Sequence, residues 1–494
     1  AEDISLHETI DQLIARSASD FDERVSPIAT DEEFLRRIYL DLTGRIPSTE
    51  QARSFLQDDA PEKRAELIDR LLETPQHARH MQHLFDVMLM NRRNKLAEWH
   101  DYLFRSFWEN KSWDQLTREL LSSDGTTPEN RPAAHFLLAR ELNPTETTRD
   151  IGRLFLGRDL ECAQCHDHPH IKDYLQRHFY GISAFLNRSY LFVDPDGKKM
   201  IGEKADGIVN FVSAFTGEEN EISPRILDAP EIPDPSLEEE PYEAKPDKTT
   251  RGIPKYSRRL LLASAMLDTQ SNDFRRNIAN RLWAWLIGHG LVEPVDMFHE
   301  ANPPSHPELL ELLGDDLFGH GYDMLNTIRQ ITLSQTYQRS SQQTSDVELS
   351  PAQYYTARLK PLTPEQLAWS TMQGTGVLDA TRAKTIERLQ QEDAELADAP
   401  DYPERLERAI NEQLQEHVQV FVETFASNSN SVKLNSTASH ALFLMNSPLL
   451  AEWLQPSAHN LVDRLQQLED TQSIAEEMYI CLLTRAPAES EVAS

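Results

Sequence analysis

Two cysteines and a histidine stand in a Cys-x-x-Cys-His pattern within the stretch "LECAQCHDHPH". This spacing is the attachment pattern of c-type haem, in which both thiols add across the vinyl groups of one haem. Two intervening residues let a single turn of chain reach both vinyl groups, and the adjacent imidazole reaches the iron. The pattern predicts one covalent haem c, anchored by Cys162 and Cys165, with His166 as the proximal ligand of its iron.

The same residues permit two other interpretations. A disulfide between Cys162 and Cys165 needs no histidine and suits an exported protein. A zinc ion would take both thiolates, His166 and either His168 or His170. Consecutive ligands at positions 165 and 166 are awkward around one tetrahedral ion, and the chain has no second paired cluster. We therefore favour the haem and keep both alternatives open.

The sequence does not fix the sixth ligand of the iron. The two histidines that directly follow the motif stand too close to His166 to reach the opposite haem face easily. His178 is far enough along the chain, and Met200 and Met297 are the methionines nearest to other informative stretches. Methionine more often fills gaps in a core. A filled sixth position favours electron transfer, whereas an open one allows chemistry on a small ligand.

A second group of polar residues lies in the stretch "DMFHEANPPSHPELL" and just before it. Asp296 and His306 are weak candidates for acid–base or ligand groups facing a pocket. Arg281 is a weak candidate for pairing with an anionic substrate or a haem propionate. The alternative interpretation is a helix start, in which Ser305 is the N-cap and Pro307 occupies the first turn.

Two further features have a structural and a functional interpretation. His77, His80 and His83 stand three residues apart on a predicted helix, where two of them could bind a metal ion on one face. We favour a solvent-facing helical surface for these histidines. Cys481, with apolar residues on both sides, is predicted to be a buried free thiol.

The elements that must position these residues are mainly α-helical. Apolar residues recur at helical spacing from residue 1 to about 188, which predicts a first helical domain containing the motif. Residues 189–250 are predicted to form a small β insert, with a hairpin turn at "DPDG", followed by an acidic, proline-rich linker. Helical patterning returns over 251–494 and predicts a second helical domain.

Composition limits the partners. The 494 residues include 49 Lys and Arg against 81 Asp and Glu, for a formal net charge of -32. Such a surface repels nucleic acids and anionic lipids. No apolar run reaches about eighteen residues, so we expect no membrane span. The start at Ala1 is compatible with a removed signal peptide, which predicts a periplasmic or extracellular location.

The stretch "LFLGRDLECAQCHDHPH" resembles the planctomycete cytochrome-like domain, and "EEFLRRIYLDLTGRIPSTEQARSFL" resembles the opening of the same domain. The second half is similar to the planctomycete-specific domain that usually follows it. The stretches that carry this second similarity are "RRNIANRLWAWLIGHGLVEPVDMFHEANPPSHPELLELL", "GYDMLNTIRQITLSQTYQRSS", "LTPEQL" and "ALFLMNSPLL". The resemblance spans nearly the whole chain, and it implies an exported haem protein without supplying a reaction.

The sequence departs from the family pattern in two places. Relatives usually carry Phe and then Trp shortly after the position of Pro169, whereas here His170 and "IKDYLQRHFYG" follow. The apolar wall of the haem pocket is therefore expected to differ. A cysteine-containing stretch common near the end of the second domain is replaced by "FASNSNSVKLNSTASH", which puts any redox role of those cysteines in doubt.

Three functional hypotheses follow. The leading one is an exported c-type haem protein that transfers electrons to a redox partner protein or performs haem-based redox chemistry. If such a protein is an enzyme, it would be an oxidoreductase. The second is an enzyme acting on an extracellular polymer such as polysaccharide, or on a small-molecule substrate, with its site in the second domain. The third is a non-haem scaffold with a zinc or disulfide cluster. The oligomeric state is left open.

Overall fold

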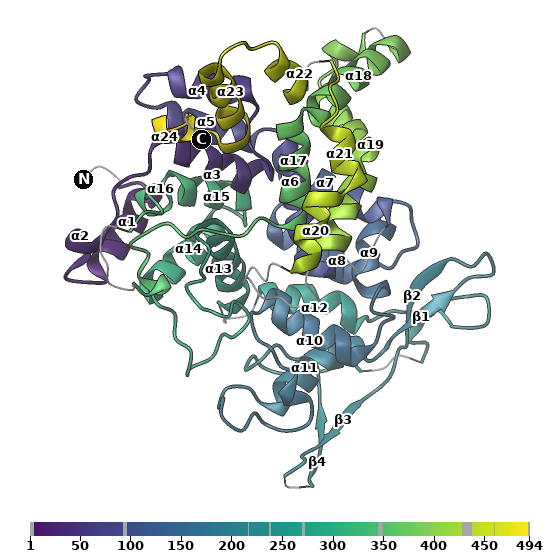
Figure 1. Cartoon of the computed structure of the whole chain (residues 1–494). Coiled ribbons are helices and arrows are strands. Elements are labelled where there is room, and N and C mark those ends of the chain that lie inside the picture. Colours follow the sequence, from purple (N-terminus) through teal and green to yellow (C-terminus); the bar gives the residue numbers. More distant parts are fainter. Residues whose placement is uncertain are drawn as a thin grey trace.

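A computed structural model describes most of the chain. The described residues are 4–91, 96–215, 217–236, 239–268, 272–343, 349–393, 395–426, 437–458 and 460–492. The predicted fold class is confirmed: this part of the molecule is mainly helical, with three small two-stranded antiparallel sheets between two runs of helices (Figure 1). None of the helices in the described ranges is both long and apolar enough to span a bilayer.

The first run of helices precedes the sheets and surrounds the motif. It consists of α1 (Leu6–Arg16), α2 (Phe21–Arg24), α3 (Asp31–Thr43), α4 (Thr49–Gln57), α5 (Lys63–Leu72), α6 (Pro75–Met90), α7 (Ala97–Trp108), α8 (Trp113–Ser122), α9 (Arg131–Leu138), α10 (Pro144–Phe155), the 3-10 turn η1 (Cys162–Gln164) and α11 (Gln176–Leu186). Local sequence explains several boundaries. Ser48 begins α4 in a capping box with Gln51. Gly44 ends α3 with φ 71°, where a Cβ atom would lie 2.5 Å from Nδ1 of His80.

The β insert consists of three hairpins. The predicted hairpin around "DPDG" pairs β1 (Ser189–Val193) with β2 (Lys199–Glu203), and Leu191 lies opposite Ile201. The second hairpin pairs β3 (Val209–Val212) with β4 (Glu219–Ile222). The third pair, β5 (Tyr242–Ala244) with β6 (Ile253–Pro254), lies at the end of the acidic, proline-rich stretch. The first two hairpins point in different directions (Figure 1).

The second run of helices follows the insert. Its elements are α12 (Arg258–Leu267), α13 (Asp273–Ile287), α14 (Pro307–Gly319), α15 (Met324–Leu333), α16 (Gln335–Gln338), η2 (Pro351–Gln353), α17 (Pro364–Thr375), α18 (Val377–Glu392), η3 (Leu396–Asp398), α19 (Tyr402–Phe425), α20 (Ala438–Asn446), α21 (Pro448–Trp453), α22 (Leu461–Gln466), α23 (Thr471–Leu483) and α24 (Glu489–Val492). The N-cap predicted for α14 is one residue early. His306 is the N-cap residue, and its side chain makes no capping hydrogen bond.

The hydrophobic core does not stop at the predicted boundary near residue 251. One continuous cluster of buried side chains runs from Ile10 to Tyr355 and includes residues of α12 to α15 together with the first helices. A second, smaller cluster is formed by side chains of α17, α18, α19 and α21. The first half of the second run therefore packs as part of the same body as the motif-bearing helices. The division of the chain into domains stays a prediction.

A buried ion pair joins the two cores. Arg79 on α6 lies 3.0 Å from a carboxylate oxygen of Glu407 on α19, and both side chains are almost completely buried. The guanidinium also lies 3.7 Å from the ring centroid of Trp369 and donates to the carbonyl of Thr43. Gln76 donates to the other oxygen of Glu407 at 2.7 Å. Because the charges compensate each other without water, we expect the two partners to depend strongly on one another.

The predicted solvent-facing surface at the three spaced histidines is wrong. Helix α6 packs between α3, α7 and α19, so His77 and His80 are buried. Nδ1 of His77 lies 2.8 Å from the carbonyl oxygen of Leu42, which can only accept a hydrogen bond. Burial lowers the pKa of His77 to about 4, despite that hydrogen bond. The helix is buried because its neighbours cover both faces, which its histidine spacing alone cannot reveal.

This buried imidazole predicts acid sensitivity. Between pH 6.5 and about 4 the unfolded chain binds a proton at His77 that the folded chain does not, so falling pH favours unfolding. We expect about 3 kcal/mol of unfolding free energy to be lost across this window. In His77→Asn the amide still donates but does not titrate, so urea unfolding from pH 7.5 to 4 should show a smaller pH slope. Equal slopes in both proteins would contradict the prediction.

The buried ion pair predicts a large effect of neutralising one partner. Glu407→Gln leaves the Arg79 guanidinium buried without a counter-charge, and the free energy of unfolding should fall by about 3 to 5 kcal/mol. The matched control is Asp401→Asn. It breaks the half-exposed ion pair between Arg405, which lies on the same helix, and Asp401, which is the N-cap residue of that helix. That change should alter stability by less than about 1 kcal/mol. Similar losses in the two denaturation curves would refute the assignment.

Candidate functional site

The Cys-x-x-Cys-His motif lies in the loop between α10 and α11. Its first residues form the turn η1, in which the backbone amide of Cys165 donates to the carbonyl of Cys162 at 3.3 Å. Both thiols are free and exposed to solvent. Between them Ala163 is fully buried, so the turn is fixed to the protein through its middle while both sulfur atoms stay outside. A disulfide between the two cysteines, one of the predicted alternatives, is not formed in this structure.

The imidazole of His166 is held in one tautomer. Its Nδ1 atom lies 2.8 Å from the carbonyl oxygen of Asp167, and a carbonyl can only accept, so Nδ1 carries the proton. The lone pair is therefore on Nε2, for which the described residues supply no hydrogen-bond partner. An imidazole that donates to a backbone carbonyl through one nitrogen presents the other as a metal ligand.

Helix α11 holds the motif in place. The side-chain amide of Gln176 donates to the carbonyl of Cys165 at 3.0 Å, and the backbone amide of Gln176 donates to a carboxylate oxygen of Asp167 at 2.7 Å. One turn later, the hydroxyl of Tyr180 donates to the carbonyl of Gln164 at 3.0 Å. These bonds satisfy backbone carbonyls that the short turn leaves without helical partners. They fix where both cysteines and the histidine stand.

The β3–β4 hairpin forms one side of the site, which sequence reasoning missed. Phe211 stacks on Tyr180 with ring centroids 4.7 Å apart and planes 5° apart, and Gln176 donates to the carbonyl of Val212 at 3.2 Å. Phe215, just beyond β3, has its ring centroid 5.2 Å from that of His166. Its side chain is 71% exposed. The aromatic residues of this strand are visible in the sequence, but nothing in the sequence links them to the motif.

The other histidines near the motif have structural partners or stand apart. Nδ1 of His168 accepts hydrogen bonds from the backbone amides of Ile171 at 2.9 Å and His170 at 3.2 Å. Burial and the neighbouring imidazoles of His170, His166 and His299 lower the pKa of His168. Within the described ranges, no three His, Cys, Asp or Glu side chains are grouped closely enough to hold a metal ion. The zinc interpretation therefore has no preformed ligand set here.

The predicted sixth ligands lie in three different places. His178 is buried in α11, and its Nε2 lies 3.0 Å from a carboxylate oxygen of Asp228. Met200 is in β2, paired with Phe192 in the hairpin that points away from β3 and β4 (Figure 1). Met297 forms an isolated bridge with Arg158 and packs partly buried against the main core. Within the described part of the chain, none of the three makes a hydrogen bond or a ring contact with His166.

Ion pairs connect the motif loop to the second run of helices. Arg158, before the motif, lies 3.0 Å from Asp173, after it, and 2.8 Å from Asp273 at the start of α13. Burial lowers the pKa of Arg158, but the two carboxylates outweigh this and the net shift is upward. The backbone amide of Asp159 donates to the carbonyl of Asp296 at 3.0 Å. The loop is thereby fixed at both ends to the same neighbouring segment.

The second predicted group is only partly assembled. Arg281 donates to the carbonyl of Arg153 at 2.8 Å, and Asp296 lies 4.0 Å from the guanidinium of Arg153. Burial lowers the pKa of Arg281 to about 10, with Asp296 opposing the shift. His306 instead packs against the ring of Tyr354, with centroids 5.3 Å apart. Arg281 and Asp296 are therefore near one another, while no described contact brings His306 to them.

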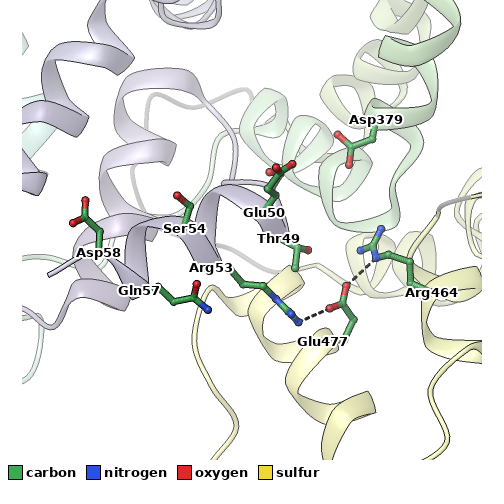
Figure 2. Close-up of a pocket in the computed structure, with 10 residues that line it drawn as sticks. Thr49, Glu50, Arg53, Ser54, Gln57, Asp58, Asp379, Arg464 and Glu477 are labelled. Carbon is green, nitrogen blue, oxygen red and sulfur yellow. Dashed lines mark hydrogen bonds and ion pairs between the residues drawn. The ribbon is translucent and has the colours of Figure 1, made fainter.

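A large cleft lies elsewhere, between α4 and the helices α18, α22 and α23 (Figure 2). Its volume is about 750 Å³. Glu477 of α23 forms ion pairs with Arg53 of α4, across the cleft, at 2.7 Å and with Arg464 of α22 at 2.8 Å. Asp379 of α18 also lines the cleft (Figure 2). None of the predicted site residues lines this cleft, whose walls come from segments more than 300 residues apart in the chain.

Cys481 lies close to this cleft and confirms the predicted buried thiol. The residue is 4% exposed, and its thiol donates to the carbonyl of Gly374 at 3.3 Å. Burial raises the pKa of the Cys481 thiol, although neighbouring Thr49 and Arg464 oppose the shift. A buried, protonated thiol is a weak nucleophile. The cysteine therefore contributes packing rather than an accessible reactive group.

Comparison with known proteins identifies the two parts of the chain. Residues 9–190 match the family PSCyt2, described as a protein of unknown function (DUF1549). Residues 258–494 match the family PSD1, also described as a protein of unknown function (DUF1553). No curated protein and no solved structure matches the chain. The two matches together cover nearly the whole chain, in the order that the resemblance implied, and the exposed Cys-x-x-Cys-His turn lies inside the first.

The anchoring of the motif by α11 predicts a local loss of order in Gln176→Leu. The variant leaves the carbonyls of Cys165 and Val212 without this donor, and stability should fall by about 1 to 3 kcal/mol. Amide hydrogen exchange should accelerate in residues 161–175 and in β3–β4. The control is Gln455→Leu, which removes one exposed bond to the carbonyl of Ala451. Unchanged exchange at the motif would show that α11 does not hold it.

Proposed function

We propose that this chain is an exported c-type haem protein that carries electrons or performs haem-based redox chemistry. The observation that carries the proposal is the arrangement of the motif side chains: two exposed free thiols on one short turn, followed by an imidazole whose Nε2 has no hydrogen-bond partner among the described residues. Covalent attachment requires reduced and accessible thiols, and iron ligation requires an unprotonated ring nitrogen. The name of the PSCyt2 family points in the same direction.

The residues that would hold the haem have distinct roles. Cys162 and Cys165 would form thioether bonds to the vinyl groups, and Nε2 of His166 would ligate the iron. The hydrogen bond from Nδ1 of His166 to the carbonyl of Asp167 would orient the ring and increase the basicity of Nε2. When bound, the haem supplies a one-electron redox centre.

The surroundings of the motif are compatible with exchange of electrons with a partner. The turn lies at the surface, at the same end of the molecule as β3 and β4 (Figure 1). Glu161 beside Cys162 is exposed and pairs with Arg149 at 2.8 Å. With a formal net charge of -32, the chain would favour a partner protein that presents a basic surface. Attachment of haem c outside the cytoplasm is the reason for the proposed export.

The test is covalent haem content after expression in a bacterium competent for cytochrome c maturation. Denatured protein in alkaline pyridine should show the reduced spectrum of thioether-linked haem, with about one haem per chain. The double variant Cys162→Ala/Cys165→Ala should contain none. The matched control is Cys481→Ala, which removes the third cysteine and should keep the full haem content.

Two outcomes would overturn the proposal. One is a colourless wild-type protein, with or without about one zinc ion per chain, under conditions that mature a reference cytochrome c. The other is the same haem content in the double variant and the wild type, because it would show binding that does not use the motif. The haem content of His166→Ala provides a further check, because this variant lacks the proximal ligand but keeps both thiols for attachment.

A further inference from the structure

Arg45, between α3 and α4, is a buried arginine whose charge has no partner in the described part of the chain. The residue is 9% exposed, and no hydrogen bond, ion pair or ring contact joins its side chain to another described residue. Every other buried arginine of the described ranges donates to a carboxylate or to a backbone carbonyl. Because an unpaired charge in the interior is strongly unfavourable, this exception points to a group that the chain itself does not supply.

A second arginine without a partner lies near the first. Arg382, on α18, is partly buried and makes no hydrogen bond or ion pair within the described ranges. Burial lowers the pKa of Arg45, the Glu407 carboxylate opposes this shift, and the Arg382 guanidinium adds to it. Two like charges that lie near one another away from bulk water repel. An anion between the two guanidiniums would turn this repulsion into two attractions.

The carboxylates near these arginines already accept hydrogen bonds from other donors. One oxygen of Glu407 lies 3.0 Å from Arg79, and the other accepts from Gln76 at 2.7 Å. Both oxygens of Asp379 lie 3.2 Å from the side-chain amide of Gln373, which donates to them. The chain therefore spends its nearby negative charges on other partners.

The charges around Arg45 indicate which kind of anion would fit. Arg45, Arg79 and Arg382 carry three positive charges, whereas Glu407 and Asp379 carry two negative charges, which leaves an excess of one positive charge. A carboxylate carries a single negative charge at neutral pH and would balance this excess. A phosphate group carries more than one negative charge at that pH and would exceed it.

The arginines lie beside the cleft between α4 and α18. Asp379, whose carboxylate raises the pKa of Arg45, lines this cleft (Figure 2). Ser48, three residues after Arg45, lines it as well. The cleft volume of about 750 Å³ leaves room for the remainder of a small organic molecule, and the hydroxyls of Thr49 and Ser54 are on its wall (Figure 2). A ligand in the cleft would thus have a route to the two guanidiniums.

We propose that Arg45 and Arg382 bind the carboxylate of a small organic acid beside this cleft. Guanidinium groups suit this ligand, because their forked N–H pairs match the two oxygens of a carboxylate. Arg45 lies in the region that matches PSCyt2, and Arg382 lies in the region that matches PSD1. Binding would therefore connect the two parts of the chain. The inference does not depend on the proposed haem.

The experiment measures acetate binding to the purified full chain by saturation-transfer difference NMR on the acetate methyl group, at neutral pH and constant ionic strength. Acetate should bind with a Kd on the order of 1 to 10 mM, and acetamide, which has a similar size and no charge, should not bind. Arg45→Met keeps an unbranched side chain without the charge, so the Kd should rise at least about tenfold, as it should in Arg382→Gln. The control is Arg388→Gln, at an exposed ion pair with Glu392 on the same helix as Arg382, which should leave the Kd unchanged.

Thermal unfolding separates a binding role of Arg45 from a structural one. Without acetate, Arg45→Met should unfold at the same temperature as the wild type or at a higher one, because the substitution removes an unpaired buried charge. A clearly lower unfolding temperature would show that Arg45 is paired within the protein, which contradicts the proposal. No acetate binding to the wild type up to about 100 mM, or an unchanged Kd in both arginine variants, would also overturn it. Displacement of acetate by inorganic phosphate below the Kd of acetate would overturn the carboxylate as the ligand.

Discussion

The ion pairs of Arg158 are the constraint on which the placement of the motif depends. Arg158 precedes the cysteines and Asp173 follows the histidine, so their contact closes the motif loop at its base. The same guanidinium lies 2.8 Å from Asp273, the first residue of α13. Asp273 is buried, and the side chains of Arg158 and Asp173 are 17% and 21% exposed. Separating a buried charge from its partner is unfavourable. The loop therefore cannot leave the second run of helices without exposing or isolating these charges.

Within the closed loop, unsatisfied backbone groups determine the local geometry. A turn as short as η1 leaves carbonyl oxygens without helical donors, and α11 supplies donors from Gln176 and Tyr180. Tyr180 also stacks on Phe211, so the helix that satisfies the turn is the helix that holds the β3–β4 hairpin. Two thiols, one imidazole and one hairpin are thus positioned by a single amphipathic helix. Because α11 contacts both the turn and the hairpin, the insert becomes part of the site although it is distant in sequence.

The sequence predicted the chemistry of the motif more fully than its surroundings. Covalent attachment needs only residue types at fixed spacing, so Cys162, Cys165 and His166 were visible in one short stretch. Their exposure and the Nε2 lone pair of the imidazole are compatible with that prediction. The second predicted group is only partly assembled. Arg281 and Asp296 both lie against Arg153, whereas His306 packs on Tyr354. Such proximity is decided by the packing of α10, α13 and the loop before α14.

By itself the sequence determined the helical periodicity, the caps, the hairpin around "DPDG" and the motif, because each depends on residues a few positions apart. Tertiary structure decided what required distant segments to meet. The core from Ile10 to Tyr355 crosses the predicted domain boundary. His77 and His80 of α6 are buried because α3 and α19 pack against that helix. Phe215 reaches His166 because α11 holds the hairpin. Burial and long-range charge pairing depend on the whole packed chain, and no local pattern records them.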